Sequence, residues 1–120
     1  MNPTADSYKR LGAFGAPEFI SWSEKSRRCF AYKKEGSSTI EVRSPDSTAN
    51  PYLAYAALIY AGLDGYLKKP DLARETCGKL PKSAEEALQI FAKSSFVRNV
   101  FPEYFVKTYI RTFGNGPADV

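Results

Sequence analysis

The chain has 120 residues, of which 43% are hydrophobic and 25% charged, and it carries a net charge of +4. These values fit one globular domain spanning residues 1–120 and exclude a disordered chain. The absence of histidine excludes a Ser–His or Cys–His nucleophile pair and any metal site built on histidine.

The chain opens on a short helix or turn, expected over residues 6–11, and a glycine-containing loop, residues 12–17. Three strand-like segments follow, at residues 19–22, 29–33 and 39–43. The polar turn at residues 34–38 predicts a hairpin between the last two strands. The simplest arrangement is a small antiparallel sheet.

The rest of the chain is predicted to be helical. Asn50 before a proline is a strong start signal for a helix that runs to about residue 67. Residues 69–82 are expected to form a connecting loop. A capping box at Ser83 predicts a second helix to about residue 92, and Pro102 begins a third. The fold class is therefore α+β, with helices packed on the sheet.

The third helix carries an apolar stripe at helical spacing, formed by Phe105, Val106, Tyr109, Ile110 and Phe113. The tail from residue 114 is expected to fray. Aromatic residues make up 14% of the chain, and this stripe is one place where they can pack.

Charge, cysteine content and hydropathy indicate which partners and which cellular location to expect. The basic excess suits a phosphate-bearing ligand or a merely solvated basic surface, and because no basic run exceeds two residues, nucleic acid is not an expected partner. Cys29 and Cys77 form no zinc spacing and are predicted to be reduced thiols. The first six residues lack a signal-peptide core, and the longest uncharged apolar stretch, residues 51–63, is too short to span a bilayer. A cytoplasmic protein without a membrane segment is expected.

The most informative stretch is the strand around Glu41. Alternate side chains of a strand share a face, so Glu41 and Arg43 project together while Ile40 and Val42 are predicted to point into the core. A carboxylate beside a guanidinium can hold a metal ion next to an anionic substrate. The same two residues also fit an ordinary surface ion pair.

A second charged segment lies before it. Residues 25–28, with Lys33 and Lys34 nearby, form a basic hairpin that suits either phosphate binding or simple solvation. The loop with Gly12 and Gly15 lacks the spacing of a phosphate-binding P-loop.

Several segments, in this order, resemble the glutamine synthetase family. Residues 2–11 resemble the family's NPTxNSYKRL, residues 40–46 and 48–54 resemble IEVRSPDPTANPYLA, and residues 61–65 match AGLDG. Looser similarity covers residues 16–17, 21–23 and 80–88. The resemblance spans nearly the whole chain and concerns only the C-terminal part of the family's catalytic domain.

The resemblance implies a reaction and roles for four residues. In that family ATP phosphorylates the glutamate side chain and ammonia displaces the phosphate, with Mg²⁺ or Mn²⁺ between phosphates and carboxylates. By resemblance, Arg10 binds the carboxylate of the substrate glutamate and Arg43 contacts the reacting glutamate or phosphate. Arg27 binds the nucleotide phosphates, and Glu41 is a metal ligand.

Three departures count against activity. Gly15 stands at the position of the family's flap glutamate, which takes a proton from ammonium, so no catalytic residue is assigned. Tyr32 and Thr39 stand where the family has arginines that contact the nucleotide. The resemblance also implies that the family's N-terminal domain and the first part of its catalytic domain, with most metal and nucleotide contacts, are absent. We expect the isolated chain to be inactive and to bind ATP and Mg²⁺ or Mn²⁺ weakly or not at all.

Other functions stay open. The chain could be a binding or regulatory module that docks on a complete synthetase or another partner, or half of a split enzyme completed by a separately encoded chain. Residues 51–63 contain no charge, and a helix that is apolar all round must be buried all round. Because so short a chain offers little to cover this helix, self-association, most simply a two-fold dimer, or dependence on a partner protein is expected.

Overall fold

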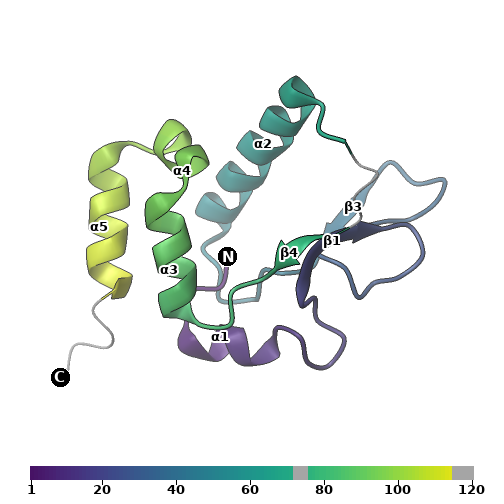
Figure 1. The fold of residues 1–120 in the computed structure, drawn as a ribbon, viewed down its shortest axis with the longest axis horizontal. Coiled ribbons are helices and arrows are strands. Elements are labelled where there is room, and N and C mark those ends of the chain that lie inside the picture. The colour runs from purple at the N-terminus through teal and green to yellow at the C-terminus, as the bar shows by residue number, and fades with distance from the viewer. Residues whose placement is uncertain (72–75, 115–120) are drawn as a thin grey trace.

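The computed structural model describes residues 1–71 and 76–114. Over this part of the chain it contains helices and a small sheet, so the predicted α+β class is confirmed (Figure 1). The elements, in chain order, are α1 (Ala5–Arg10), β1 (Phe19–Ser23), β2 (Ala31–Lys33), β3 (Ile40–Val42), α2 (Pro51–Lys68), β4 (Thr76–Lys79), α3 (Ala84–Lys93), α4 (Ser95–Val100) and α5 (Glu103–Gly114). The predictions for the Cys77 thiol and for the tail after residue 114 fall outside what the structure describes.

The strands form one mixed sheet in the order β3-β2-β1-β4. The hairpin between β2 and β3 is present as predicted, with Tyr32 opposite Glu41 and with Gly36 at a φ of 71° in the turn. The central pair, β1 and β2, is parallel, with Trp22 opposite Ala31. The prediction of an antiparallel sheet is therefore wrong for this pair.

The connection between β1 and β2 explains the parallel pairing. The Ser23 hydroxyl accepts hydrogen bonds from the backbone N–H groups of Lys25 and Ser26, both at 3.1 Å, and so bends the chain at the end of β1. The Cys29 thiol then lies 3.0 Å from the carbonyl oxygen of Ser26 and 3.1 Å from that of Ala31, across a second bend, and can donate its hydrogen to either. Two reversals restore the original direction, so β2 runs the same way as β1.

The prediction that residues 69–82 form only a loop is also wrong. They include β4, which pairs antiparallel with β1 and places Phe19 opposite Lys79. The backbone N–H of Leu80 extends the ladder by donating to the carbonyl of Glu18 at 2.8 Å. β4 contains Gly78 at a φ of 140°, and glycine within a strand lowers its local propensity. The strand exists because β1 offers it an unpaired edge.

The predicted helix starts are confirmed by their caps. The side-chain oxygen of Asn50 accepts hydrogen bonds from the N–H groups of Tyr52 at 3.0 Å and Leu53 at 3.3 Å. The Ser83 hydroxyl accepts from the N–H of Glu86 at 3.1 Å, while the Glu86 carboxylate accepts an N–H one residue before the cap. These bonds satisfy N–H groups that have no partner within the helix.

The short helix α4 was missed by the sequence analysis. Ser94 both ends α3 and caps α4, accepting the N–H of Val97 at 3.3 Å. Six residues are too few to show a helical period of apolar residues.

The helical core is an aromatic cluster centred on Tyr109 of α5. Its ring lies 5.0 Å from that of Phe91 in α3, 5.8 Å from that of Phe105 and 4.5 Å from that of Phe113, measured between ring centroids. Such separations are those of favourable aromatic pairs. The predicted stripe on the third helix is confirmed as a packing surface.

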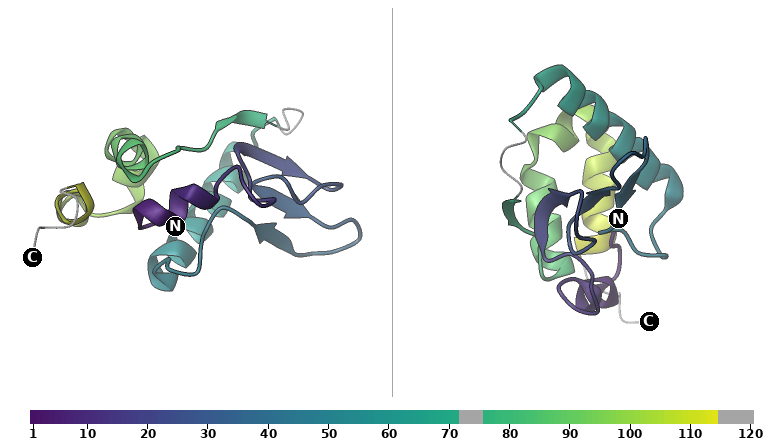
Figure 2. Two further views of the ribbon diagram at one scale, coloured as in Figure 1. Left: turned by 90° about the horizontal axis from the view of Figure 1, so that it is seen from below. Right: turned by 90° about the vertical axis from the view of Figure 1, so that its right-hand side faces the viewer.

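The molecule is open for its size. Its accessible surface is 9173 Å², whereas a folded monomer of 13.4 kDa is expected to expose about 6,500 Å². Its radius of gyration is 15.0 Å, against about 13.6 Å for a compact domain of this length. In Figure 1, and in the view from below in Figure 2, α2 lies between the sheet and the α3–α5 group. None of its residues is buried.

The prediction that Ile40 points into the core is wrong. Ile40 belongs to the edge strand β3, and it is 62% exposed.

Among the described helices, none is both long and apolar enough to cross a membrane.

Candidate functional site

The candidate site is built around Glu41 in the middle of β3. The connection between β1 and β2 brings Arg27 to it, although the two residues are 14 positions apart in the sequence. Nε of Arg27 donates to one carboxylate oxygen at 3.1 Å, and Nη2 donates to the other at 3.0 Å. This is the two-pronged geometry in which a guanidinium matches a carboxylate. Arg27 therefore occupies both oxygens of the residue expected to bind metal.

Tyr32 lies beside this pair. It lies directly opposite Glu41 in the β2–β3 register, and the centre of the Arg27 guanidinium is 4.5 Å from the centroid of its ring. A cation over an aromatic face is attracted by the negative face of the ring. We call Arg27, Tyr32 and Glu41 the Arg27–Glu41 cluster.

Electrostatics keep both partners of the pair charged. The hydrogen bond from Arg27 lowers the pKa of Glu41 below its ordinary value, and the charges of Arg27 and Arg43 add to the effect. The same hydrogen bond raises the pKa of Arg27. The side chains are 57% and 49% exposed, so water screens the attraction, and an exposed pair of this kind contributes little to stability.

Arg43 lies just beyond β3, and its charge acts on Glu41 as the alternation along the strand predicts. Its backbone N–H donates to the carbonyl of Phe30 at 2.8 Å, which continues the hairpin past the last strand residue. The structure thus pairs Glu41 of the edge strand with Arg27, and Arg43 follows two residues later in the same strand direction.

Arg10 is held elsewhere, at the end of α1. Its guanidinium donates to three successive backbone carbonyl oxygens, those of Arg43 at 3.4 Å, Ser44 at 2.5 Å and Pro45 at 3.1 Å. It therefore ties α1 to the segment that follows β3. The role of Arg10 in binding a substrate carboxylate stays a prediction, and its fork in this structure serves the backbone.

Sequence reasoning missed a neighbouring network around Asp46. Burial alone would raise the pKa of Asp46, but hydrogen bonds from Ser7 and Thr48 outweigh it and hold the pKa below its ordinary value. Ser7 is buried, and Thr48 donates both its N–H, at 2.9 Å, and its hydroxyl, at 2.6 Å. Both ends of this network lie in segments that carry the family resemblance. The contact between Ser7 and Asp46 depends on tertiary packing, so no local signal reveals it.

The loop at residues 12–16 has a backbone suited to glycine. Gly15 has a φ of 78°, and nothing lies within 4 Å of the position its Cβ would take. Phe14 beside it has a φ of 50° and is fully exposed. Gly15 therefore offers no carboxylate in this loop.

The donor set does not fit a divalent metal ion. Such ions prefer several oxygen ligands, and Glu41 contributes a carboxylate whose two oxygens face Arg27. Within residues 1–71 and 76–114, no group of three or more His, Cys, Asp or Glu side chains is placed to hold a metal.

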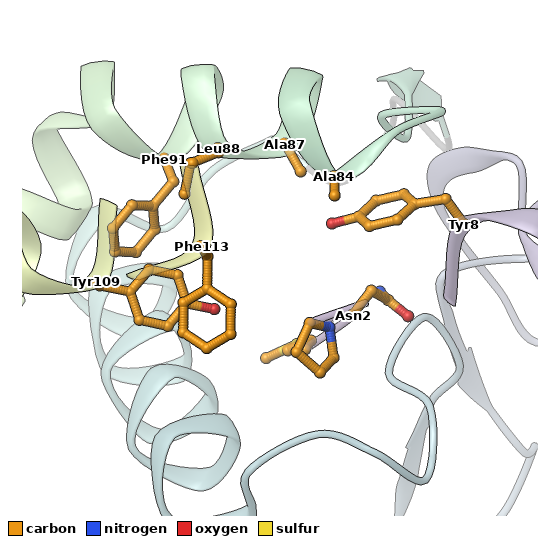
Figure 3. Close-up of a pocket in the computed structure, with 10 residues that line it drawn as sticks. Asn2, Tyr8, Ala84, Ala87, Leu88, Phe91, Tyr109 and Phe113 are labelled. Atoms are coloured by element: carbon orange, nitrogen blue, oxygen red, sulfur yellow. The ribbon is translucent and has the colours of Figure 1, made fainter. Parts of the chain in front are cut away.

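A small pocket lies away from this cluster, between α1 and the pair α3 and α5 (Figure 3). Its volume is about 140 Å³, and Tyr8 extends its hydroxyl into it beneath α3. Burial raises the pKa of both Tyr8 and Tyr109, so both hydroxyls stay neutral. Because ligand pockets usually measure about 300–1,000 Å³, this one is a packing gap between two parts of the fold.

Comparison with known proteins places these observations in one family. Residues 1–113 match the model of the glutamine synthetase catalytic domain. A glutamine synthetase of Thermococcus kodakarensis is 42% identical over 118 residues, covering 81% of this chain and 26% of that protein. One from Methanosarcina mazei is 35% identical over 130 residues, covering 91% of this chain and 29% of that protein.

The chain therefore belongs to the glutamine synthetase catalytic-domain family. It spans only about a quarter of the length of the first of these relatives. A shorter stretch of 75 residues is 48% identical to a glutamine synthetase of Pyrococcus furiosus. The family predicted from the sequence motifs is confirmed.

Proposed function

We propose that this 120-residue chain is a C-terminal catalytic-domain segment of the glutamine synthetase family that does not make glutamine by itself. The observation that carries the proposal is the Arg27–Glu41 pair. For the family reaction, Glu41 would ligate a divalent ion and Arg27 would bind nucleotide phosphates. Here the guanidinium of Arg27 donates hydrogen bonds of 3.0 and 3.1 Å to the carboxylate of Glu41. Both would have to be released before either could bind a ligand.

Three residues support the same proposal. Gly15 offers no base, and loss of a general base typically costs about 10²–10⁴-fold in rate. Tyr32 supplies a ring under Arg27 in place of a second guanidinium on the nucleotide. Thr39 forms a hydroxyl pair with Ser37 at 2.7 Å within the hairpin turn. Neither Tyr32 nor Thr39 can replace the phosphate-binding arginines that the family has at these two positions.

Binding of the family's ligands is proposed to be weak. A single carboxylate leaves Mg²⁺ with most of its waters, and the exposed arginines attract phosphate only by charge that salt screens. Calorimetric titration of ATP with Mg²⁺ or Mn²⁺ at physiological salt tests the proposal. We expect no saturable heat, and a micromolar site in the unmodified chain would contradict it. Arg27→Gln, which frees Glu41, shows whether the pair itself is what blocks a metal.

A binding module that docks on a complete synthetase or another partner is the second candidate, and the exposed apolar side of α2 favours it. The expected location is the cytoplasm, consistent with Cys29 as a buried free thiol. Mixing the chain with a complete synthetase and measuring both particle mass and synthetase activity tests this candidate. The split-enzyme alternative is disfavoured because a second chain would not restore the residues replaced by Gly15, Tyr32 and Thr39.

A further inference from the structure

Tyr32 contacts one partner of the Arg27–Glu41 pair and faces the other. It lies directly opposite Glu41 in the antiparallel β2–β3 ladder, so the two side chains project from the same face of the sheet. The guanidinium of Arg27 lies over the Tyr32 ring, with its central carbon 4.5 Å from the ring centroid, while Nε and Nη2 donate to the Glu41 carboxylate. One side chain from the β1–β2 connection is therefore held by two side chains of the hairpin.

The ion pair alone is a weak restraint on so long a side chain. The Arg27 and Glu41 side chains are 57% and 49% exposed, and water screens the attraction between exposed charges. Ordering an arginine also costs rotamer entropy, which an isolated surface pair hardly offsets. The Tyr32 ring adds an attraction for the cation and limits the positions that the guanidinium can take. The ring and the carboxylate thus act on the same guanidinium, and their effects are expected to be coupled.

The neighbouring charges leave this arrangement to Arg27. The ammonium of Lys33, one residue after Tyr32, pairs with Glu24 at 3.4 Å. Arg43 acts on Glu41 through its charge, whereas Arg27 donates hydrogen bonds to both carboxylate oxygens. The state of the Glu41 carboxylate therefore depends on where the Arg27 guanidinium is held.

We propose that Tyr32 is a positioning residue: its ring holds Arg27 on Glu41, and the cluster acts as an autoinhibitory contact that withholds the guanidinium from phosphate groups. This inference rests on the proposed function, in which the pair must open before either residue binds a ligand. It adds that the ring, rather than the two charges alone, sets how readily the pair opens. A phosphate group and the Glu41 carboxylate then compete for the same N–H donors.

The chain offers a matched control for the ring. Lys79 in β4 lies 5.3 Å from the centroid of the Phe19 ring and 3.1 Å from the Glu18 carboxylate, which is the same combination of cation, ring and carboxylate elsewhere on the sheet. Tyr32→Leu removes the ring from Arg27, and Phe19→Leu removes the ring from Lys79. Tyr32→Phe keeps the ring without its hydroxyl. Tyr32→Val repeats the first change with a residue of high strand propensity.

Two measurements report on Arg27 itself. One is the hydrogen-exchange rate of its Nε–H group by heteronuclear NMR, and the other is a titration with inorganic pyrophosphate followed at the same signal. In Tyr32→Leu and Tyr32→Val we expect about 2- to 5-fold faster exchange and about 2- to 5-fold tighter pyrophosphate binding, the size of one exposed cation–π contact. Tyr32→Phe and Phe19→Leu should match the unmodified chain. In a Glu41→Ala background, Tyr32→Leu should not raise the affinity, because the pair is already broken.

Three results would overturn the inference. Tyr32→Leu and Tyr32→Val, shown by circular dichroism to be folded, could leave both measurements unchanged. Phe19→Leu could have an equal effect, or Tyr32→Leu could raise the affinity as much without Glu41. Each result would show that the ring does not act through the pair. Failure of the proposed function looks different, because the unmodified chain would then bind ATP with Mg²⁺ in a saturable way or make glutamine, whatever the Tyr32 variants do.

Discussion

The guanidinium of Arg27 and the carboxylate of Glu41 face each other fork to fork, with Nε and Nη2 each donating to a different oxygen. The loop after β1 supplies one partner and the edge strand β3 supplies the other. In the family these two positions are expected to serve a nucleotide and a metal, respectively. Here they form an ion pair within the protein. This pair sets the pKa of Glu41 and the expected effect of replacing Arg27.

Breaking the pair should raise the pKa of Glu41. In Arg27→Gln the carboxylate loses the hydrogen bond that lowers its pKa, and we expect the pKa to rise toward the ordinary value of a glutamate. Carboxyl-carbon NMR titration measures this. Glu103, whose pKa is lowered by Lys107, is the control and should titrate unchanged.

The sign of the pH dependence follows. Because the folded pKa of Glu41 is depressed, its small contribution to stability is present above the unfolded pKa near 4.3 and is lost as pH falls through the folded value. A pKa of Glu41 that is the same in Arg27→Gln as in the unmodified chain would show that the pair does not persist in solution.

Arg10 should matter for stability. Arg10→Ala removes charged donors from three backbone carbonyls, one of them on buried Ser44, and should lower the free energy of unfolding by about 2–3 kcal/mol. Arg10→Lys should restore only part of this, because an ammonium lacks the planar fork. Urea unfolding measures both. The control, Arg28→Ala at an exposed position, should change stability by less than about 0.5 kcal/mol, and an equal effect at the two positions would refute the tether.

The same substitution at two glycines should have opposite effects. Gly15→Ala puts a Cβ on a left-handed backbone and should destabilise the fold by about 1 kcal/mol, although the space around it is open. Gly65→Ala, inside α2 and also free of close neighbours, should stabilise the fold by about 0.5–1 kcal/mol. Thermal unfolding of both variants checks the signs, and two changes in the same direction would contradict the backbone assignment of Gly15.

The sequence predicted the elements whose signals are local. Asn50 and Ser83 mark helix starts because a cap needs only its own side chain and the next few N–H groups. The parallel pairing of β1 with β2 depends on two bends held by Ser23 and Cys29, and β4 depends on the free edge of β1. Neither has a period or a turn motif of its own.

The residues of the candidate site were predicted from the sequence, but their contacts with one another were not. The motif around Glu41 and Arg43 identified the strand and the family. The partner of Glu41 was not predictable, because Arg27 reaches it only after the hairpin register places Tyr32 opposite Glu41, where its ring lies against the Arg27 guanidinium. The commitment of Arg10 to backbone carbonyls likewise requires α1 to pack against the segment after β3.

Glutamine formation tests the central claim most directly. The purified chain, supplied with glutamate, ammonia, ATP and Mg²⁺ or Mn²⁺, should produce no glutamine above a buffer control, while a complete synthetase in the same assay does. Gly15→Glu should rescue nothing, because the added carboxylate does not release Glu41 from Arg27 or supply further ligands. Turnover that survives repurification and is abolished by Glu41→Ala would contradict the account, since it would show a working site in this chain alone.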